Sequence, residues 1–146
     1  IGLMRAVSDG ANNVINKNNK NKELNIGVLE EKLEANGIPK SDCVHTVPAK
    51  GIIERVDTLL QLCDYVVISE KGGFGTLLEM VGAFHVNQLN KKFGGVVKPI
   101  IFVGDVWQKL YNDIIISLDM HNQDDGKSFI HFVKTYDEAL GVIKSN

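Results

Sequence analysis

The chain has 146 residues, a formal net charge of −2 at pH 7 and a hydrophobic content of 44%. These values are typical of one soluble globular domain with a sizeable core. The nearly balanced charge argues against a surface built for nonspecific binding to nucleic acid. No apolar run approaches the roughly 20 residues that cross a bilayer, so no membrane partner is expected. The two cysteines lack Cys-x-x-Cys spacing, which predicts neither a disulfide framework nor a zinc site and favours a reducing, cytoplasmic setting.

The first half of the chain contains two predicted helices and two predicted strands. Apolar residues at helical spacing near the start predict a helix whose inner face is Ala6, Val7, Ala11, Val14 and Ile15. Residues 16–22 are all Asn or Lys and predict a solvated connector. Residues 24–29 predict a buried strand, and residues 44–47 a short strand ended by Pro48. A second helix is predicted over residues 52–63, with Ile53, Val56, Leu59, Leu60 and Cys63 on its apolar face.

The second half continues the alternation. The continuous apolar run at residues 65–68 predicts a strand of a parallel sheet that is covered on both faces. The elements predicted after it are a helix over 76–86, a strand region over 96–103, a helix over 106–118, a strand over 131–133 and a helix over 136–143. We interpret Trp107 and Tyr111, which share a helix face, as core or subunit contacts in preference to a base-stacking surface.

Strands that alternate with helices predict an α/β protein of Rossmann-like, doubly wound form, with a mostly parallel sheet and helices on both faces. We expect a single nucleotide-binding domain over residues 1–146. The first predicted helix has no strand before it, so we also expect this chain to lack an N-terminal strand.

A glycine-rich loop follows the strand at 65–68 and precedes a helix. Ligands bind beyond the carboxyl ends of the strands in open α/β sheets. The loop contains Gly72, Gly73 and Gly75. We expect these glycines to let the backbone approach an anion and to adopt positive φ angles. Amides at the following helix start favour a phosphate, Thr76 adds a hydroxyl donor and Lys71 adds positive charge.

Local sequence alone leaves alternatives open. The loop is neither a Walker A motif nor a spaced Gly-x-Gly-x-x-Gly fingerprint, so it could be a tight turn without a ligand. Residues 76–79 also match a capping box, in which Thr76 and Glu79 satisfy helix amides. For Arg55, the alternative to a functional role is a surface pair with Glu54 or Asp57.

Residues 71–79, Lys-Gly-Gly-Phe-Gly-Thr-Leu-Leu-Glu, resemble the Pro-Gly-Gly-x-Gly-Thr-x-x-Glu signature of the LOG family. Members of this family are cytokinin riboside 5′-monophosphate phosphoribohydrolases, long mislabelled as lysine decarboxylases. Residues 2–11 are similar to the family's Gly-Leu-Met-Gly-Ala-Val-x-x-Gly-Ala helix, and Glu54-Arg55 resembles its Met-His-x-Arg-Lys segment. Residues 98–101 look like its Lys-Pro-Val-Val strand, with Trp107 following as in several members.

The resemblance implies hydrolysis of the N-glycosidic bond of a purine or cytokinin-type nucleoside 5′-monophosphate, without a metal or organic cofactor. Glu79 and Arg55 are the implied catalytic residues. The implied nucleotide-binding residues are Met4, Lys71, Gly72, Gly73, Gly75 and Thr76. It also implies a homodimer with the ligand site close to the subunit interface. The four histidines show no metal-ligand spacing, and no lysine has a context that would anchor pyridoxal phosphate.

Several positions depart from the family pattern. Lys71 replaces the signature proline, Val56 follows Arg55 where lysine is usual, and Ile52 and Ile53 replace Met-His. Arg5 stands where a small residue is usual, and the family's glycine cluster would precede Gly2. These departures keep a second hypothesis open, a nucleotide-binding or carrier protein of the same fold without catalysis.

Overall fold

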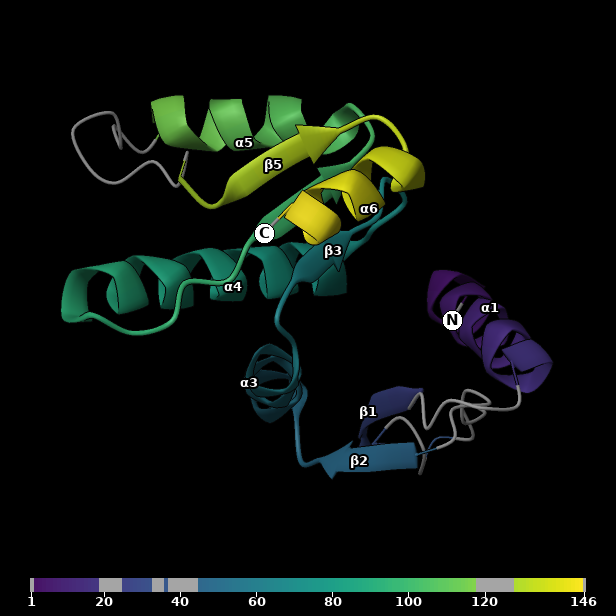
Figure 1. Ribbon diagram of the computed structural model, residues 1–146. Helices are drawn as coiled ribbons and strands as arrows, with labels where there is room; N and C mark the ends of the chain where they lie inside the picture. The colour runs from purple at the N-terminus through teal and green to yellow at the C-terminus, as the bar shows by residue number, and fades with distance from the viewer. Residues whose placement is uncertain (1, 19–24, 33–35, 37–44, 118–127, 146) are drawn as a thin grey trace. The chain divides into compact units, whose positions relative to one another are not determined.

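The computed structural model describes residues 2–18, 25–32, 36, 45–117 and 128–145, and only the backbone of residues 2–5, 15–18, 115 and 116. The chain divides into two compact units, Ile1–Gln61 and Leu62–Asn146. The described residues form five helices and two small sheets, one of two strands and one of three, in which every pair of strands is parallel (Figure 1). This confirms the predicted α/β class and the parallel pairing.

The first unit contains α1 (Gly2–Asn18), β1 (Ile26–Glu30), β2 (His45–Ala49) and α3 (Ile52–Leu62). Strands β1 and β2 pair in parallel, with Ile26 opposite His45 and Glu30 opposite Ala49. Pro48 lies inside β2 opposite Leu29, so the prediction that it ends the strand is wrong. A proline lacks a donor but keeps its carbonyl, and it is tolerated in a strand that has a free side.

Helix α1 is held to β1 by a polar cluster. The Asn25 side-chain amide donates to Ser8 Oγ at 2.9 Å, to Ser8 O at 3.1 Å and to Asn12 Oδ1 at 3.0 Å. Ser8 is buried, whereas Val7 and Val14 are 65% and 52% exposed. The helix was predicted correctly, but Ala6, Val7 and Val14 of its predicted inner face are exposed, while Ala11 is half-buried and the Ile15 side chain is outside the described set. Hydrogen bonds to Asn25 hold the Ser8 side of the helix. The helix also continues to Asn18, into the predicted connector, whose residues 19–22 lie outside the described part.

Helix α3 buries Val56, as predicted, but Ile53 is 71% exposed and does not belong to its buried face. Cys63 follows the helix at the start of the second unit and is half-buried. Burial raises the pKa of its thiol above the usual value, which keeps it protonated and unreactive at neutral pH.

The second unit is built on β3 (Val66–Ile68), β4 (Ile100–Val103) and β5 (Ile130–Val133), in the order β3-β4-β5. Val66 lies opposite Ile100, and Ile100 lies opposite Ile130. All four residues of the central strand β4 are buried. Its continuous Ile-Ile-Phe-Val run is what a strand covered on both faces requires.

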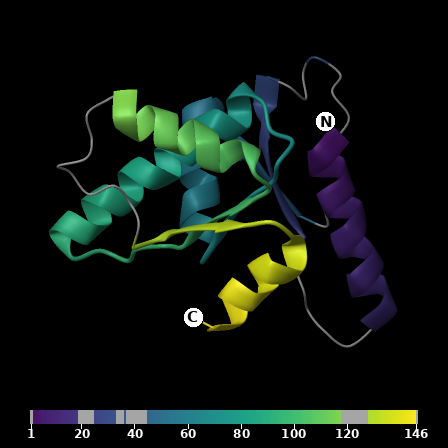
Figure 2. The ribbon, with the colours of Figure 1, turned by 90° about the horizontal axis from the view of Figure 1, so that it is seen from above.

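Helices cover both faces of this sheet. Residues of α4 (Phe74–Phe93) and α5 (Val106–Ser117) meet Ile100 and Phe102 on one face. On the other face, Ile101 and Val103 pack against Ala139 of α6 (Tyr136–Ser145). In Figure 1, α6 lies in front of the strands while α4 and α5 lie behind them, and Figure 2 shows α4 and α5 together on one side of β5. This arrangement is the doubly wound layering predicted from the sequence.

In the second unit, boundaries differ most from prediction at two elements. Helix α4 begins two residues before the predicted Thr76 and continues past Val86 to Phe93, where Gly94 ends it with a φ of 76° and donates its N–H to Asn90 O. The predicted strand region at 96–103 contains a strand only from Ile100. Leu118, the predicted last residue of α5, lies outside the described residues.

Asn87 joins α4 to the segment that enters β4. Its side chain is 3% exposed, its Oδ1 accepts from Lys98 N at 2.9 Å, and its Nδ2 donates to Lys98 O at 2.6 Å. The buried Asn87 amide thus bonds both the N–H and the C=O of Lys98. It takes the place of the hydrogen bonds that a neighbouring strand would supply, because β4 has not yet begun at Lys98. Asn87 therefore sets the distance between α4 and the start of the central strand.

We expect Asn87→Ala to lower the free energy of unfolding by about 1–3 kcal/mol, because it leaves the backbone groups of Lys98 without these partners. Urea unfolding followed by circular dichroism measures this change. The matched control is Asn112→Ala, an exposed asparagine on α5, which should change stability by no more than about 0.5 kcal/mol. Equal effects of the two substitutions would contradict this role of Asn87.

Candidate functional site

The carboxyl ends of β3, β4 and β5 meet at one edge of the three-stranded sheet, where ligands bind in folds of this type. Ser69 follows β3, and its Oγ lies 2.7 Å from the Tyr136 hydroxyl, which belongs to the first turn of α6. Gly104 follows β4 and donates its N–H to Val133 O at 2.8 Å. Ser69 and Tyr136 were not identified as site residues from the sequence, although Ser69 directly follows a predicted strand and Tyr136 begins the helix after another.

The glycine loop leads from this edge into α4. Gly73 is the N-cap, with φ −112° and ψ −159°, and Leu77 N donates to Gly73 O at 3.0 Å. Phe74, Gly75 and Thr76 form the first turn, whose amides have no acceptor within the helix. Gly73 has no side chain to cap them. The capping-box interpretation of Thr76 and Glu79 is therefore wrong: the helix starts before Thr76, and Glu79 lies well inside it.

The glycines of the loop serve different purposes. None of them has the positive φ angle expected from the sequence; among the described glycines, Gly94 and Gly104 do. A Cβ on Gly72 would lie 2.7 Å from Thr76 Cβ and 2.7 Å from Trp107 Cζ2, so packing requires glycine there. A Cβ on Gly73 or Gly75 would meet nothing within 4 Å. Packing within the described residues therefore leaves room at these two positions for a ligand.

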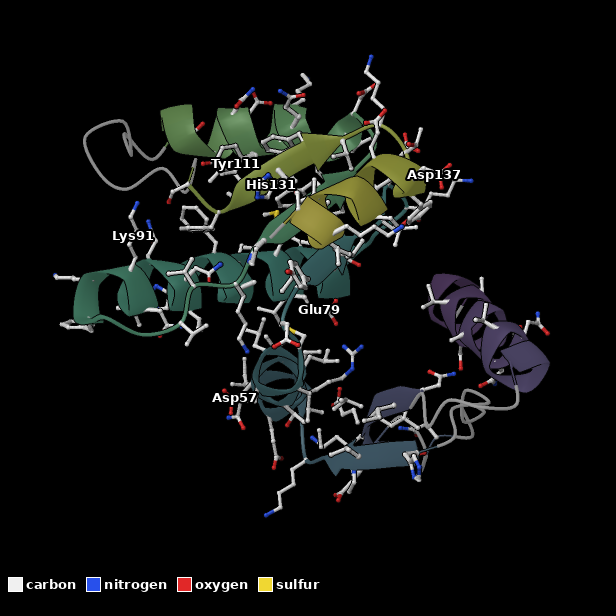
Figure 3. All side chains as sticks on the ribbon, in the orientation of Figure 1. Asp57, Glu79, Lys91, Tyr111, His131 and Asp137 are labelled. Atoms are coloured by element: carbon white, nitrogen blue, oxygen red, sulfur yellow. The ribbon has the colours of Figure 1, made fainter. Side chains whose placement is uncertain are left out.

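Glu79 lies on the same side of α4 as the open space at Gly75, because residues four apart in a helix share a face. The buried residues Met80 and Ala83 come one and four residues after Glu79, so Glu79 borders the buried side of α4. Along the helix axis, Glu79 lies about 7 Å beyond Phe74, which is on the scale of a ribose phosphate. Its side chain is half-buried, and Figure 3 shows it on α4.

The charges around the loop are mixed. Lys71 is exposed at the start of the loop, but Glu70 and Asp105 are exposed at the same edge of the sheet. Gly104, with a φ of 94°, lies close to the Glu70 side chain. An anion at this edge would depend on Lys71 and on the positive end of the α4 dipole, because the neighbouring carboxylates oppose it.

Arg55 belongs to the first unit and is described within it. It lies on α3, and its Nε donates to Val28 O of β1 at 3.1 Å. Glu54 and Asp57, the acids considered as surface partners for it, accept from other donors. Glu54 Oε2 accepts from Lys50 N at 2.7 Å, and Asp57 Oδ2 accepts from Gln61 Nε2 at 2.8 Å. Arg55 thus ties α3 to β1.

The remaining predicted site residue, Met4, lies in α1, but its side chain is outside the described set. Trp107 is buried, and Tyr111 is half-buried, packs edge-on against Phe84 and contacts Phe132, which agrees with the core interpretation made from the sequence. In the part of the chain that is described, no three His, Cys, Asp or Glu side chains gather in a way that could hold a metal ion. None of its helices combines the length and apolar character needed to span a membrane.

Comparison with known proteins identifies one family. The family described as "Possible lysine decarboxylase" matches residues 4–143, nearly the whole chain. No curated protein matches the sequence.

We expect Gly72→Ala to lower the free energy of unfolding by about 1–3 kcal/mol, because the added methyl group must displace Thr76 or Trp107. Gly73→Ala and Gly75→Ala provide matched controls. Both should fold as the parent protein does, and we expect Gly75→Ala to gain up to about 1 kcal/mol from helix propensity. Thermal unfolding of the three variants tests this contrast. Equal losses of stability at all three positions would contradict it.

Proposed function

Because the chain belongs to the LOG family, we propose that it hydrolyses the N-glycosidic bond of a purine or cytokinin-type nucleoside 5′-monophosphate. The products are the free base and ribose 5-phosphate. The observation that carries this proposal is the pairing of two features on one face of α4. These are the open glycine positions at its first turn and the Glu79 carboxylate one turn further on.

The phosphate of the substrate would bind at the start of α4. The first-turn amides of residues 74–76 lack acceptors within the helix, and the helix dipole adds partial positive charge. Gly73 and Gly75 keep side chains out of the way of a close approach. Lys71 supplies a full positive charge from the loop, in place of the proline of the family signature.

The sugar would then extend along α4 towards Glu79. Breaking the bond between C1′ and the base nitrogen leaves positive charge on the sugar, which a nearby carboxylate stabilises. The same carboxylate can accept a proton from the attacking water while the water oxygen forms a bond to C1′. The electron pair of the broken bond leaves with the base, which takes up a proton.

We assign Arg55 an electrostatic role, binding the ligand or stabilising the departing base, because a guanidinium stays protonated and is a poor acid. We also propose a homodimer with the site near the subunit interface, as the family resemblance implies. The reaction as written needs no metal or organic cofactor.

One observation favours a second candidate, a nucleotide-binding protein without catalysis. The Arg55 Nε is engaged by the Val28 carbonyl, so this arginine has a structural role in the first unit whatever else it does. The phosphate site could therefore bind a nucleotide while no arginine contacts the nucleobase. The protein would then bind the nucleotide without cleaving it.

The experiment that separates the two candidates follows release of free base from AMP and from an N6-substituted AMP by chromatography. We expect release by the parent protein and a loss of at least about a hundredfold in Glu79→Gln, because this change removes the carboxylate that acts in the transition state. AMP should still raise the melting temperature of Glu79→Gln, since the phosphate contacts remain. Arg55→Ala should also slow the release of base.

The control for Glu79→Gln is Asp113→Asn, which removes one carboxylate from an exposed position on α5 and should leave base release unchanged. If the parent protein is stabilised by AMP but releases no base, the hydrolase is excluded for these substrates and the binding protein is supported. If AMP neither stabilises the protein nor is cleaved, both candidates fail for AMP.

A further inference from the structure

Trp107, on the first turn of α5, lies next to the start of the glycine loop. Its side chain is 4% exposed, and its Nε1 donates to Ser69 O at 2.7 Å. Ser69 is the residue at which the chain leaves β3 for the loop. A buried indole N–H needs an acceptor, and here the acceptor is the backbone that begins the loop.

The indole also lies close to Gly72, in the middle of the loop. A Cβ on Gly72 would lie 2.7 Å from Trp107 Cζ2, which is two bonds from Nε1, and equally close to Thr76 Cβ. Gly72 is exposed, but the Trp107 ring and the first turn of α4 occupy the space that its side chain would need. One side chain fixes the entrance of the loop through a hydrogen bond and its middle through contact.

The ring has a rigid support of its own. It packs against Phe102 of the central strand, with ring centroids 6.2 Å apart and planes tilted by 41°. Phe102 is fully buried and stacks in turn on Phe132 of β5, with centroids 5.2 Å apart. Trp107 therefore connects the loop to the core of the sheet.

We propose that Trp107 is a positioning residue for phosphate binding. By holding Ser69 and Gly72, it sets the direction in which the first amides of α4 face a phosphate, without touching the ligand itself. This inference rests on the proposed function, because it concerns the phosphate of the nucleotide that the site would bind.

The test compares AMP with adenosine, which lacks the phosphate, by calorimetric titration of the full chain. Trp107→Phe keeps an aromatic ring beneath the loop but removes the N–H donor. We expect its dissociation constant for AMP to rise by about threefold to tenfold, the effect of one lost hydrogen bond, while that for adenosine stays unchanged. If the role of Trp107 is purely structural, Trp107→Phe should weaken the binding of both AMP and adenosine, or of neither. The control is Tyr111→Phe, which alters an aromatic residue one turn further along α5 and should change neither constant.

A second measurement covers the case in which Trp107→Phe does not fold. Trp107 is the only tryptophan of the chain, so its fluorescence reports on this contact. Gly72→Ala must displace the ring or the loop, so we expect a red-shifted emission together with weaker AMP binding, whereas Gly73→Ala should leave the emission unchanged.

The outcomes separate the inference from the function on which it rests. If the parent protein binds AMP and Trp107→Phe binds it equally well, the positioning role is wrong and the proposed function stands. Unchanged emission and unchanged AMP affinity in Gly72→Ala would overturn it likewise. If the parent protein does not bind AMP, the proposed function fails and the positioning role fails with it.

Discussion

The burial of strand β4 is the constraint on which the second unit depends. Its four residues are between 0% and 4% exposed because helices cover both faces of the sheet. Phe102 fills one face and contacts Trp107, while Ile101 and Val103 pack beneath α6 on the other. A strand enclosed in this way cannot shift its register without exposing apolar surface. It therefore fixes the carboxyl edge where the neighbouring strands and the glycine loop meet.

The glycine loop takes its shape from packing at this edge. Gly72 is glycine because the Thr76 side chain and the Trp107 ring leave no room for a Cβ, and not because its backbone needs a positive φ. Gly73 and Gly75 meet no such restriction. The loop thus has one glycine that maintains the fold and two that leave space at a helix start suited to an anion. Packing therefore distinguishes Gly72 from Gly73 and Gly75 within one short motif.

Much of this was accessible from the sequence, since apolar runs and helical periodicity depend on burial. The strand at β3, the parallel pairing and the helix after the loop were predicted correctly. The exposure of Val7 and Val14 on α1 was not predicted, because the side chain of Asn25 forms hydrogen bonds with the polar side that contains Ser8. Contacts between distant residues, such as Trp107 with Ser69, have no local pattern at all. The assignments of Glu79 and Arg55 stay predictions, since each residue is described within its own unit.

The most direct test of the central claim is a titration of the ¹⁵N-labelled full chain with AMP, followed by amide chemical shifts. If a phosphate binds at the start of α4, the amides of residues 72–76 should show the largest shifts, saturating together. Adenosine at the same concentrations should leave them nearly unchanged. Shifts that centre elsewhere in the chain, or that adenosine reproduces in full, would contradict a phosphate site at this loop.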